Sequence, residues 1–211
     1  MPDLPTLTTS FNQLQTWARK HAPTVTFRPP ADPAVVENFA AKSGLTLPDS
    51  LREALRIADG ETRASSGMIG NWRLLPLAEI QGAWGLLTQL AEKGAFVGLE
   101  PETPPYLRNV WWHPGWIPIV ASGSGDFFCL DTAPPEAART GQVVLFLQGR
   151  PERPLIAGGW RAWWDRIARD LESGVYTYHE ETGFNGEAFL WSALQGKHLL
   201  DGRNGKRVVV R

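Results

Sequence analysis

Hydrophobic residues in the centre of the chain form three short runs that have the length of β-strands. They cover residues 117–121, 127–130 and 143–147 and are rich in Ile, Val and Phe, which suit a pleated sheet. The residues between the first two runs, 122–125, read Ser-Gly-Ser-Gly, which is typical of a tight turn. The pattern predicts a three-stranded antiparallel meander at the centre of the fold.

Residues on both sides of the meander follow the spacing of amphipathic helices. Helices are expected from a capping box at 10–13 to about His21, from Asp32 to Gly44, and from Pro48 to Gly60. Two more are expected at 77–93 and 160–173, with a short strand at 72–75 and an edge strand at 153–157. Gly82 and Gly85 weaken the helix at 77–93, and we expect close packing to compensate.

Composition indicates one globular domain of ordinary type. The 211 residues carry a net charge of −1, so no global charge points to nucleic acid or to an anionic membrane. The single cysteine excludes an internal disulfide, the first residues show no signal-peptide pattern, and no apolar run approaches the length of a membrane span. We therefore expect a cytoplasmic protein, with a domain at 1–176 and a basic C-terminal extension at 177–211.

Motifs for catalysis, cofactors and metals are absent from the sequence. The four histidines have no metal-ligand spacing, and neither Ser122 nor Ser124 lies in a Gly-x-Ser-x-Gly motif. The Gly-rich turn precedes a strand, so it offers no helix N-terminus to a phosphate. Cys129 lies inside a predicted strand and is expected to be buried. The sequence predicts no catalytic residue, no cofactor and no metal.

Two acidic residues, Asp126 and Asp131, flank the second strand of the meander. Positions five apart on a strand point to opposite faces, so a general acid–base pair is not expected. Either each carboxylate accepts hydrogen bonds from turn backbone, or both line a partner-binding face.

The ten tryptophans are unusual, and two groups of them flank the central strands. Adjacent tryptophans are not expected to point into one core, so one of Trp111 and Trp112 should lie at the surface, where tryptophan often supports binding. Packing under a loop is the alternative. The candidate partner-binding residues are Asp126, Asp131, Trp111, Trp112, His113 and, from the loop at 61–70, Arg63.

Four segments in a fixed order resemble the SUKH superfamily. They are L-P-D-S-L-R-E-A-L-R-I-A-D-G at 47–60, W-R-L-L-P-L-A-E-I at 72–80, W-I-P-I to G-Q-V at 116–143, and A-W-W-D-R-I-A-R-D-L-E-S-G at 162–174. This superfamily includes the yeast cell-wall-assembly regulator and many bacterial immunity proteins. The resemblance covers roughly residues 11–176.

The resemblance implies an α+β fold with a single, mostly antiparallel sheet covered by helices, in agreement with the pattern. It also implies a non-catalytic protein-binding module, most concretely an immunity protein that binds and neutralises a toxin. A regulator or scaffold in cell-wall or signalling pathways is the alternative, and an enzyme with an unfamiliar site is a third. The near-neutral charge argues against a nucleic-acid-targeting toxin as the partner. A protein partner is expected, without nucleic acid or membrane.

Overall fold

The computed structural model describes residues 6–64, 67–68, 72–173, 178–179 and 183–184, and the fold is α+β, as predicted. The helices are α1 (Leu7–His21), α2 (Pro33–Ser43), α3 (Asp49–Ile57), α4 (Leu77–Glu92) and α5 (Trp160–Glu172). The main sheet contains β1 (Arg73–Leu74), β2 (Trp116–Ala121), β3 (Phe127–Asp131), β4 (Gln142–Phe146) and β5 (Leu155–Ala157). A short 3-10 helix, η1 (Ala137–Arg139), and the pair β6 (Tyr178–His179) and β7 (Gly183–Phe184) complete the described elements. The domain boundary at 176/177 stays a prediction.

The strands follow one another in the sheet in the order β1-β2-β3-β4-β5, and every neighbouring pair is antiparallel. The predicted meander of β2, β3 and β4 is therefore confirmed. A register shift between Pro118 and Val120 bends β2 at its proline. The strand that follows Pro154 lies at the sheet edge, where the missing proline N–H costs no ladder bond.

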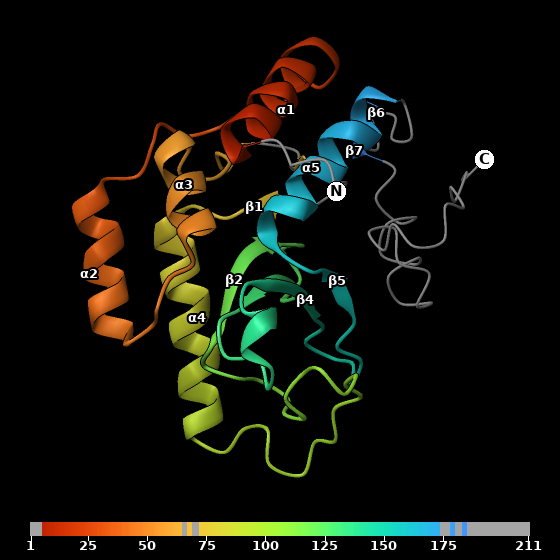
Figure 1. Ribbon diagram of the computed structural model, residues 1–211. Coiled ribbons are helices and arrows are strands. Elements are labelled where there is room, and N and C mark those ends of the chain that lie inside the picture. Colours follow the sequence, from red (N-terminus) through yellow and green to blue (C-terminus); the bar gives the residue numbers. More distant parts are fainter. Residues whose placement is uncertain (1–5, 65–66, 69–71, 174–177, 180–182, 185–211) are drawn as a thin grey trace.

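The two faces of the sheet are covered by different material. On one face, Phe128, Leu130 and Val143 belong to a core that also contains buried residues of α1, α3 and α5. On the other face, Cys129 and Val144 pack against α4 and against the irregular segment that leads from α4 to β2. Figure 1 shows this arrangement, with α1, α5 and α3 above the sheet and the segment after α4 below it.

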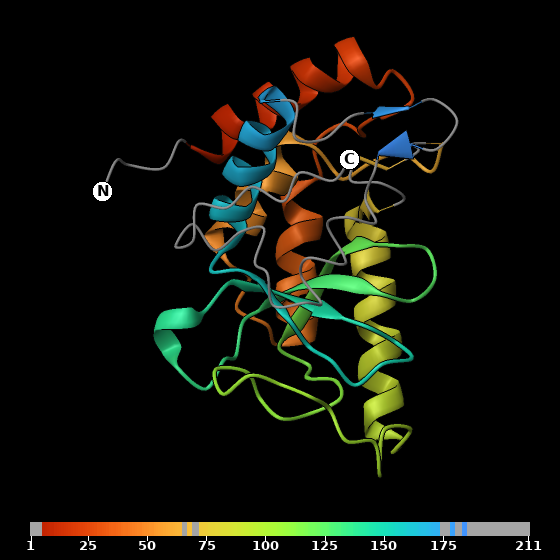
Figure 2. The same ribbon diagram turned by 90° about the vertical axis from the view of Figure 1, so that its right-hand side faces the viewer.

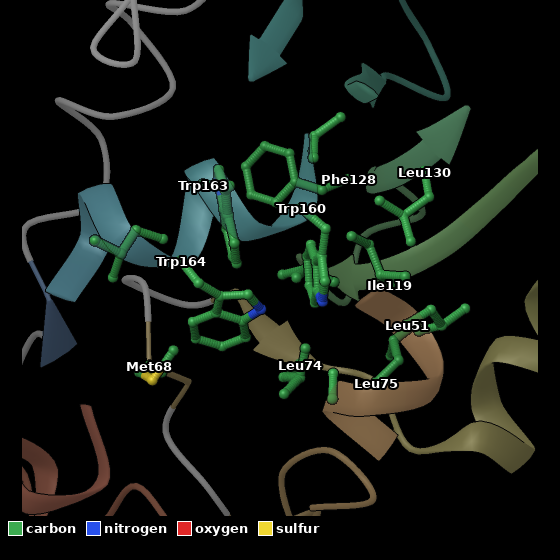
Figure 3. Packing of buried hydrophobic residues seen from close by; sticks show 14 of the residues in the cluster. Leu51, Met68, Leu74, Leu75, Ile119, Phe128, Leu130, Trp160, Trp163 and Trp164 are labelled. Atoms are coloured by element: carbon green, nitrogen blue, oxygen red, sulfur yellow. The ribbon is translucent and has the colours of Figure 1, made fainter. Parts of the chain in front are cut away.

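Three tryptophans of α5 lie in the core between helix and sheet (Figure 3). The rings of Trp160 and Trp163 stack with centroids 5.0 Å apart. Trp163 lies 6.0 Å from Phe128 of β3, and Trp164 lies 5.2 Å from Phe11 of α1. The expectation that adjacent tryptophans cannot share a core was wrong here, because α5 lies between the sheet and α1 and is buried on both sides.

Two details of the helices differ from expectation. Helix α1 begins at Leu7 with Thr6 as N-cap, and Ser10, the predicted cap, is buried inside the helix. In α4, Gly82 and Gly85 are not closely packed, since a Cβ at either position would meet nothing within 4 Å. Asp32 and Gly44 do cap α2 at its two ends, as predicted. Among the described helices, none combines the length and apolar character needed to cross a bilayer.

The turn at 59–61 connects α3 to β1 and to the start of α4. Gly60 has a φ of +67°, and a Cβ there would lie 2.4 Å from the nitrogen of Pro76. The Asp59 carboxylate accepts a hydrogen bond from the first backbone N–H of α4, at Leu77, over 2.7 Å. The Glu61 carboxylate is buried and accepts from the N–H of Leu74 over 2.8 Å. Only glycine fits at the centre of this turn.

Replacing Gly60 by alanine is expected to destabilise the fold by about 3 kcal/mol or more, because the new Cβ overlaps backbone atoms that have no room to move. Gly44→Ala is the matched control: its φ is +69°, but nothing lies within 4 Å of an added Cβ, so we expect a loss of only about 1 kcal/mol. Urea unfolding curves measure both. Equal losses would show that the contact at Pro76 is unimportant.

Candidate partner-binding surface

A pocket of about 250 Å³ opens between β1, the first half of α4 and the turn between β2 and β3. Arg73 and Glu79 supply its charged side chains and Ser122 supplies a hydroxyl, while Leu75 and Phe127 form apolar parts of the lining. The size and the mixed lining suit one inserted side chain of a partner protein rather than a large cofactor.

An ion-pair network of two arginines and one glutamate lies at this pocket. Glu79 pairs with Arg73 and with Arg63, whose Nε lies 3.4 Å from the carboxylate. Arg73 also donates to the backbone carbonyl of Glu61 over 3.3 Å. The side chain of Arg63 is 88% exposed. Arg63 is therefore the member of the network that a partner can engage with the least disturbance of the fold.

Asp126 lies in the turn beside the pocket. Its carboxylate accepts from the N–H of Gln148 over 2.9 Å and from the hydroxyl of Ser124 over 3.4 Å. A Cβ at Gly125 would collide with the Gln148 side chain, so the turn closes tightly on this residue. The interpretation that Asp126 bonds turn backbone is confirmed. Its turn also borders the pocket, whose lining includes Ser122 and Gly123.

The remaining predicted residues lie at the opposite end of the sheet. Asp131 pairs with Trp116 at the far end of β3, about 16 Å along the strand from Asp126. Trp111, Trp112 and His113 occupy the segment just before β2, at that same end. The six predicted residues therefore do not form one continuous rim.

Two of the predicted surface residues are buried, so placing them at the surface was wrong. Asp131 accepts from the N–H of Ala133 over 3.0 Å and from the side-chain amide of Gln142 over 2.9 Å, and burial raises the pKa of its carboxyl. Trp112 is 4% exposed and donates its indole N–H to the Thr88 hydroxyl over 3.3 Å. Both side chains help to cover the face of the sheet that contains Cys129 and Val144.

His113 and Trp111 are half-buried at the same end. The Nδ1 atom of His113 accepts from the N–H of Gly115 over 2.9 Å, which requires that nitrogen to be unprotonated. Burial first, and the charge of Arg108 second, lower the pKa of His113, and the nearby Asp131 raises it.

Arg153 is a structural residue that the sequence did not reveal. Its guanidinium is buried and donates to the backbone carbonyls of Trp111, Arg150 and Glu152 over 2.7–3.2 Å. It also lies 4.6 Å from the ring centres of Trp111 and Phe146. Burial lowers its pKa to about 10, so it stays charged at neutral pH. The sequence predicted at this position only the start of an edge strand before Pro154.

The chemistry of these groups favours binding. Cys129 is buried in β3, as predicted, and burial raises the pKa of its thiol and so disfavours the nucleophilic thiolate. Within the described part of the chain, no group of three or more His, Cys, Asp or Glu side chains is placed to hold a metal ion.

A model of the SMI1/KNR4 family (SUKH-1) matches residues 30–166, which is more than half of the chain. The chain belongs to this family. The matched region runs from just before α2 into α5 and includes both ends of the sheet. Helix α1 precedes it and packs on α5, so it extends the family core with one further layer.

Curated relatives of this SMI1/KNR4 chain are fungal regulators. It is 29% identical to the cell wall biosynthesis/cell cycle regulator smi1 of Schizosaccharomyces pombe, over 70% of this chain and 32% of the relative. It is 25% identical to a glucan synthesis regulatory protein of Neurospora crassa, over 65% and 32%. It is 20% identical to the cell wall assembly regulator SMI1 of Saccharomyces cerevisiae, over 78% and 40%. The matches span about a third of these relatives' length.

Replacing the two aspartates by lysine separates their roles. Asp131→Lys buries an unpaired charge and leaves the Ala133 N–H without its acceptor, so we expect a loss of about 3 kcal/mol or more. Asp126→Lys removes the half-buried carboxylate that accepts from the N–H of the exposed Gln148 and should cost about 1 kcal/mol. Chemical denaturation measures both. Similar losses would contradict the different burial of the two carboxylates.

Acid is expected to weaken the fold through His113. Its folded pKa lies below the usual 6.5, so the unfolded state takes up the proton first, and stability falls as the pH drops from about 7 to 5. Asn at this position keeps an acceptor for Gly115 without titrating in that range. We expect His113→Asn to reduce the slope of unfolding free energy against pH. An unchanged slope would show that His113 does not titrate differently on folding.

Proposed function

We propose that this chain is a non-catalytic protein-binding module of a regulatory system, and that it engages its partner at the pocket beside β1 and α4. This is the regulator alternative raised by the sequence. The observation that carries it is the exposed Arg63, paired with Glu79 at the mouth of a pocket that accepts one side chain. The names of the matched fungal relatives support a regulatory task. A cytoplasmic location is part of this proposal.

The other candidate side chains have structural roles, which supports a binding function over a catalytic one. Asp126 and Asp131 use their carboxylates to fix backbone, and His113 accepts a backbone N–H. Cys129 is enclosed in the core. These side chains hold turns and strands together, whereas Arg73 lines the pocket and the exposed Arg63 pairs with Glu79, which also lines it.

Toxin neutralisation remains a prediction from the superfamily resemblance. The near-neutral charge of the chain and the regulatory names of its matched relatives favour the regulator function instead. An immunity role would require a single tight toxin partner, which the experiment below would recover.

Charge reversal at the pocket tests the proposal. The intact chain, Arg63→Glu and Arg19→Glu are each immobilised and exposed to lysate of the source cells, and bound proteins are quantified by mass spectrometry. Arg19 lies exposed on α1, away from the pocket, so it controls for the change in charge. We expect Arg63→Glu to lose at least about 90% of a specific regulatory partner, equivalent to tenfold weaker binding, and Arg19→Glu to retain it.

If both variants captured the partner equally well, the pocket would not be the binding site. A single partner that carries a toxin domain would replace the regulator function with immunity. Melting curves of both variants, expected to match the native chain, confirm that the loss of binding does not reflect unfolding.

A further inference from the structure

The pocket between β1, α4 and the turn that joins β2 to β3 carries more positive than negative charge. Arg73 lies in its lining, and Arg63 pairs with the lining residue Glu79. Among the described lining residues, Glu79 is the one acidic group. Figure 2 shows the turn next to the first half of α4. Two guanidinium groups therefore meet one carboxylate at this opening, which leaves an excess of one positive charge.

The other acidic groups nearby do not cancel this excess, because each has partners of its own. Asp59 pairs with Arg28. The buried Glu61 carboxylate accepts hydrogen bonds from two backbone N–H groups. The charge of Asp126 interacts with both arginines of the segment 150–153, which outnumber the one glutamate of that segment. The positive charge at the pocket is thus left for a ligand to neutralise.

The geometry of the two arginines suits a carboxylate ligand. The Nε atom of Arg63 lies 3.4 Å from Glu79, which is longer than a usual charge-assisted hydrogen bond, and the side chain is 88% exposed. A guanidinium on an exposed side chain can turn its fork of N–H groups to an incoming carboxylate and bond both oxygens. Leu75 and Phe127 add apolar lining, which suits the methylene groups of a glutamate.

We propose that the pocket binds the side-chain carboxylate of a glutamate on the partner protein, an inference that rests on the proposed function of the pocket. Arg63 and Arg73 donate to this carboxylate, and its methylene groups pack on Leu75 and Phe127. The charge selects the ligand. One negative charge equals the excess at the pocket, whereas a phosphate group, with about two negative charges, exceeds it. A basic side chain would meet two like charges.

Glu79 then competes with the ligand for the two arginines instead of contacting the partner. Glu79→Gln keeps the size of the side chain and an acceptor oxygen, but it removes the negative charge and so raises the excess from one to two. We expect this variant to bind a carboxylate about three- to fivefold more tightly, which is the size of an exposed charge interaction. If the partner inserted a basic side chain, Glu79 would be its acceptor and the same variant would bind more weakly.

An NMR titration with small compounds tests the ligand without knowledge of the partner. N-acetylglutamate N-methylamide and its glutamine and phosphoserine counterparts are each added to the isotope-labelled chain at neutral pH. The Nε–H signals of Arg63 and Arg73 and the backbone N–H of Gly123 report binding at the pocket. We expect the glutamate compound to shift these signals with a Kd on the order of millimolar, and the glutamine compound to leave them unchanged.

The same titration of two variants tests the role of Glu79. Glu79→Gln should lower the Kd of the glutamate compound about three- to fivefold. Glu37→Gln is the matched control, because it also removes a carboxylate that pairs with an arginine, Arg52, but does not line the pocket. It should leave the Kd unchanged. Melting curves show that both variants are folded.

Three results would overturn the assignment of a carboxylate ligand. They are equal shifts with the glutamate and glutamine compounds, tighter binding of the phosphoserine compound, or weaker binding of the glutamate compound by Glu79→Gln. Capture from lysate separates this inference from the proposed function. If Arg63→Glu and Glu79→Gln both lose the partner, the pocket is the binding site but its ligand is not a carboxylate. If Arg63→Glu retains the partner, the proposed function fails, while the titration still decides the ligand of the pocket.

Discussion

The turn at 59–61 is the constraint on which the remaining structure depends. Its backbone is hydrogen-bonded to the segment before α2: the N–H of Asp59 donates to the carbonyl of Pro29, and the N–H of Arg28 donates to the carbonyl of Gly60. The carboxylates on either side of Gly60 then hold the start of α4 and the backbone of β1. Because Glu61 occupies the outer edge of β1, this two-residue strand is not left open for another chain to pair with. The position of the pocket, with Arg73 on β1 and Glu79 on α4, follows from this turn.

The two faces of the sheet are buried by different kinds of structure. One face is covered by regular helices, which satisfy their own backbone groups. The other is covered mainly by the irregular segment between α4 and β2, whose carbonyl groups need donors. Arg153 supplies donors to one of them: its guanidinium donates to the carbonyl of Trp111 in that segment and to the carbonyls of Arg150 and Glu152 in the loop before β5, and it lies over the rings of Trp111 and Phe146. A buried cation normally costs free energy, but here carbonyl dipoles and ring faces replace the lost water. The indole of Trp112 and the carboxylate of Asp131 complete this cover.

Features with a local cause were predictable from the sequence, whereas features set by distant segments were not. The meander follows from strand-length apolar runs separated by a Ser-Gly turn, and the caps of α2 from Asp32 and Gly44, all within a few residues. The burial of Asp131 and Trp112 depends instead on a segment that crosses the sheet from elsewhere, and nothing near them in sequence indicates it. Trp163 and Trp164 share one core because α1, some 150 residues earlier, covers the far side of α5. Of the candidate site, the sequence identified Arg63 and Asp126 but missed Arg73 and Glu79, which line a pocket only because the turn between β2 and β3, some 45 residues later, lies against them.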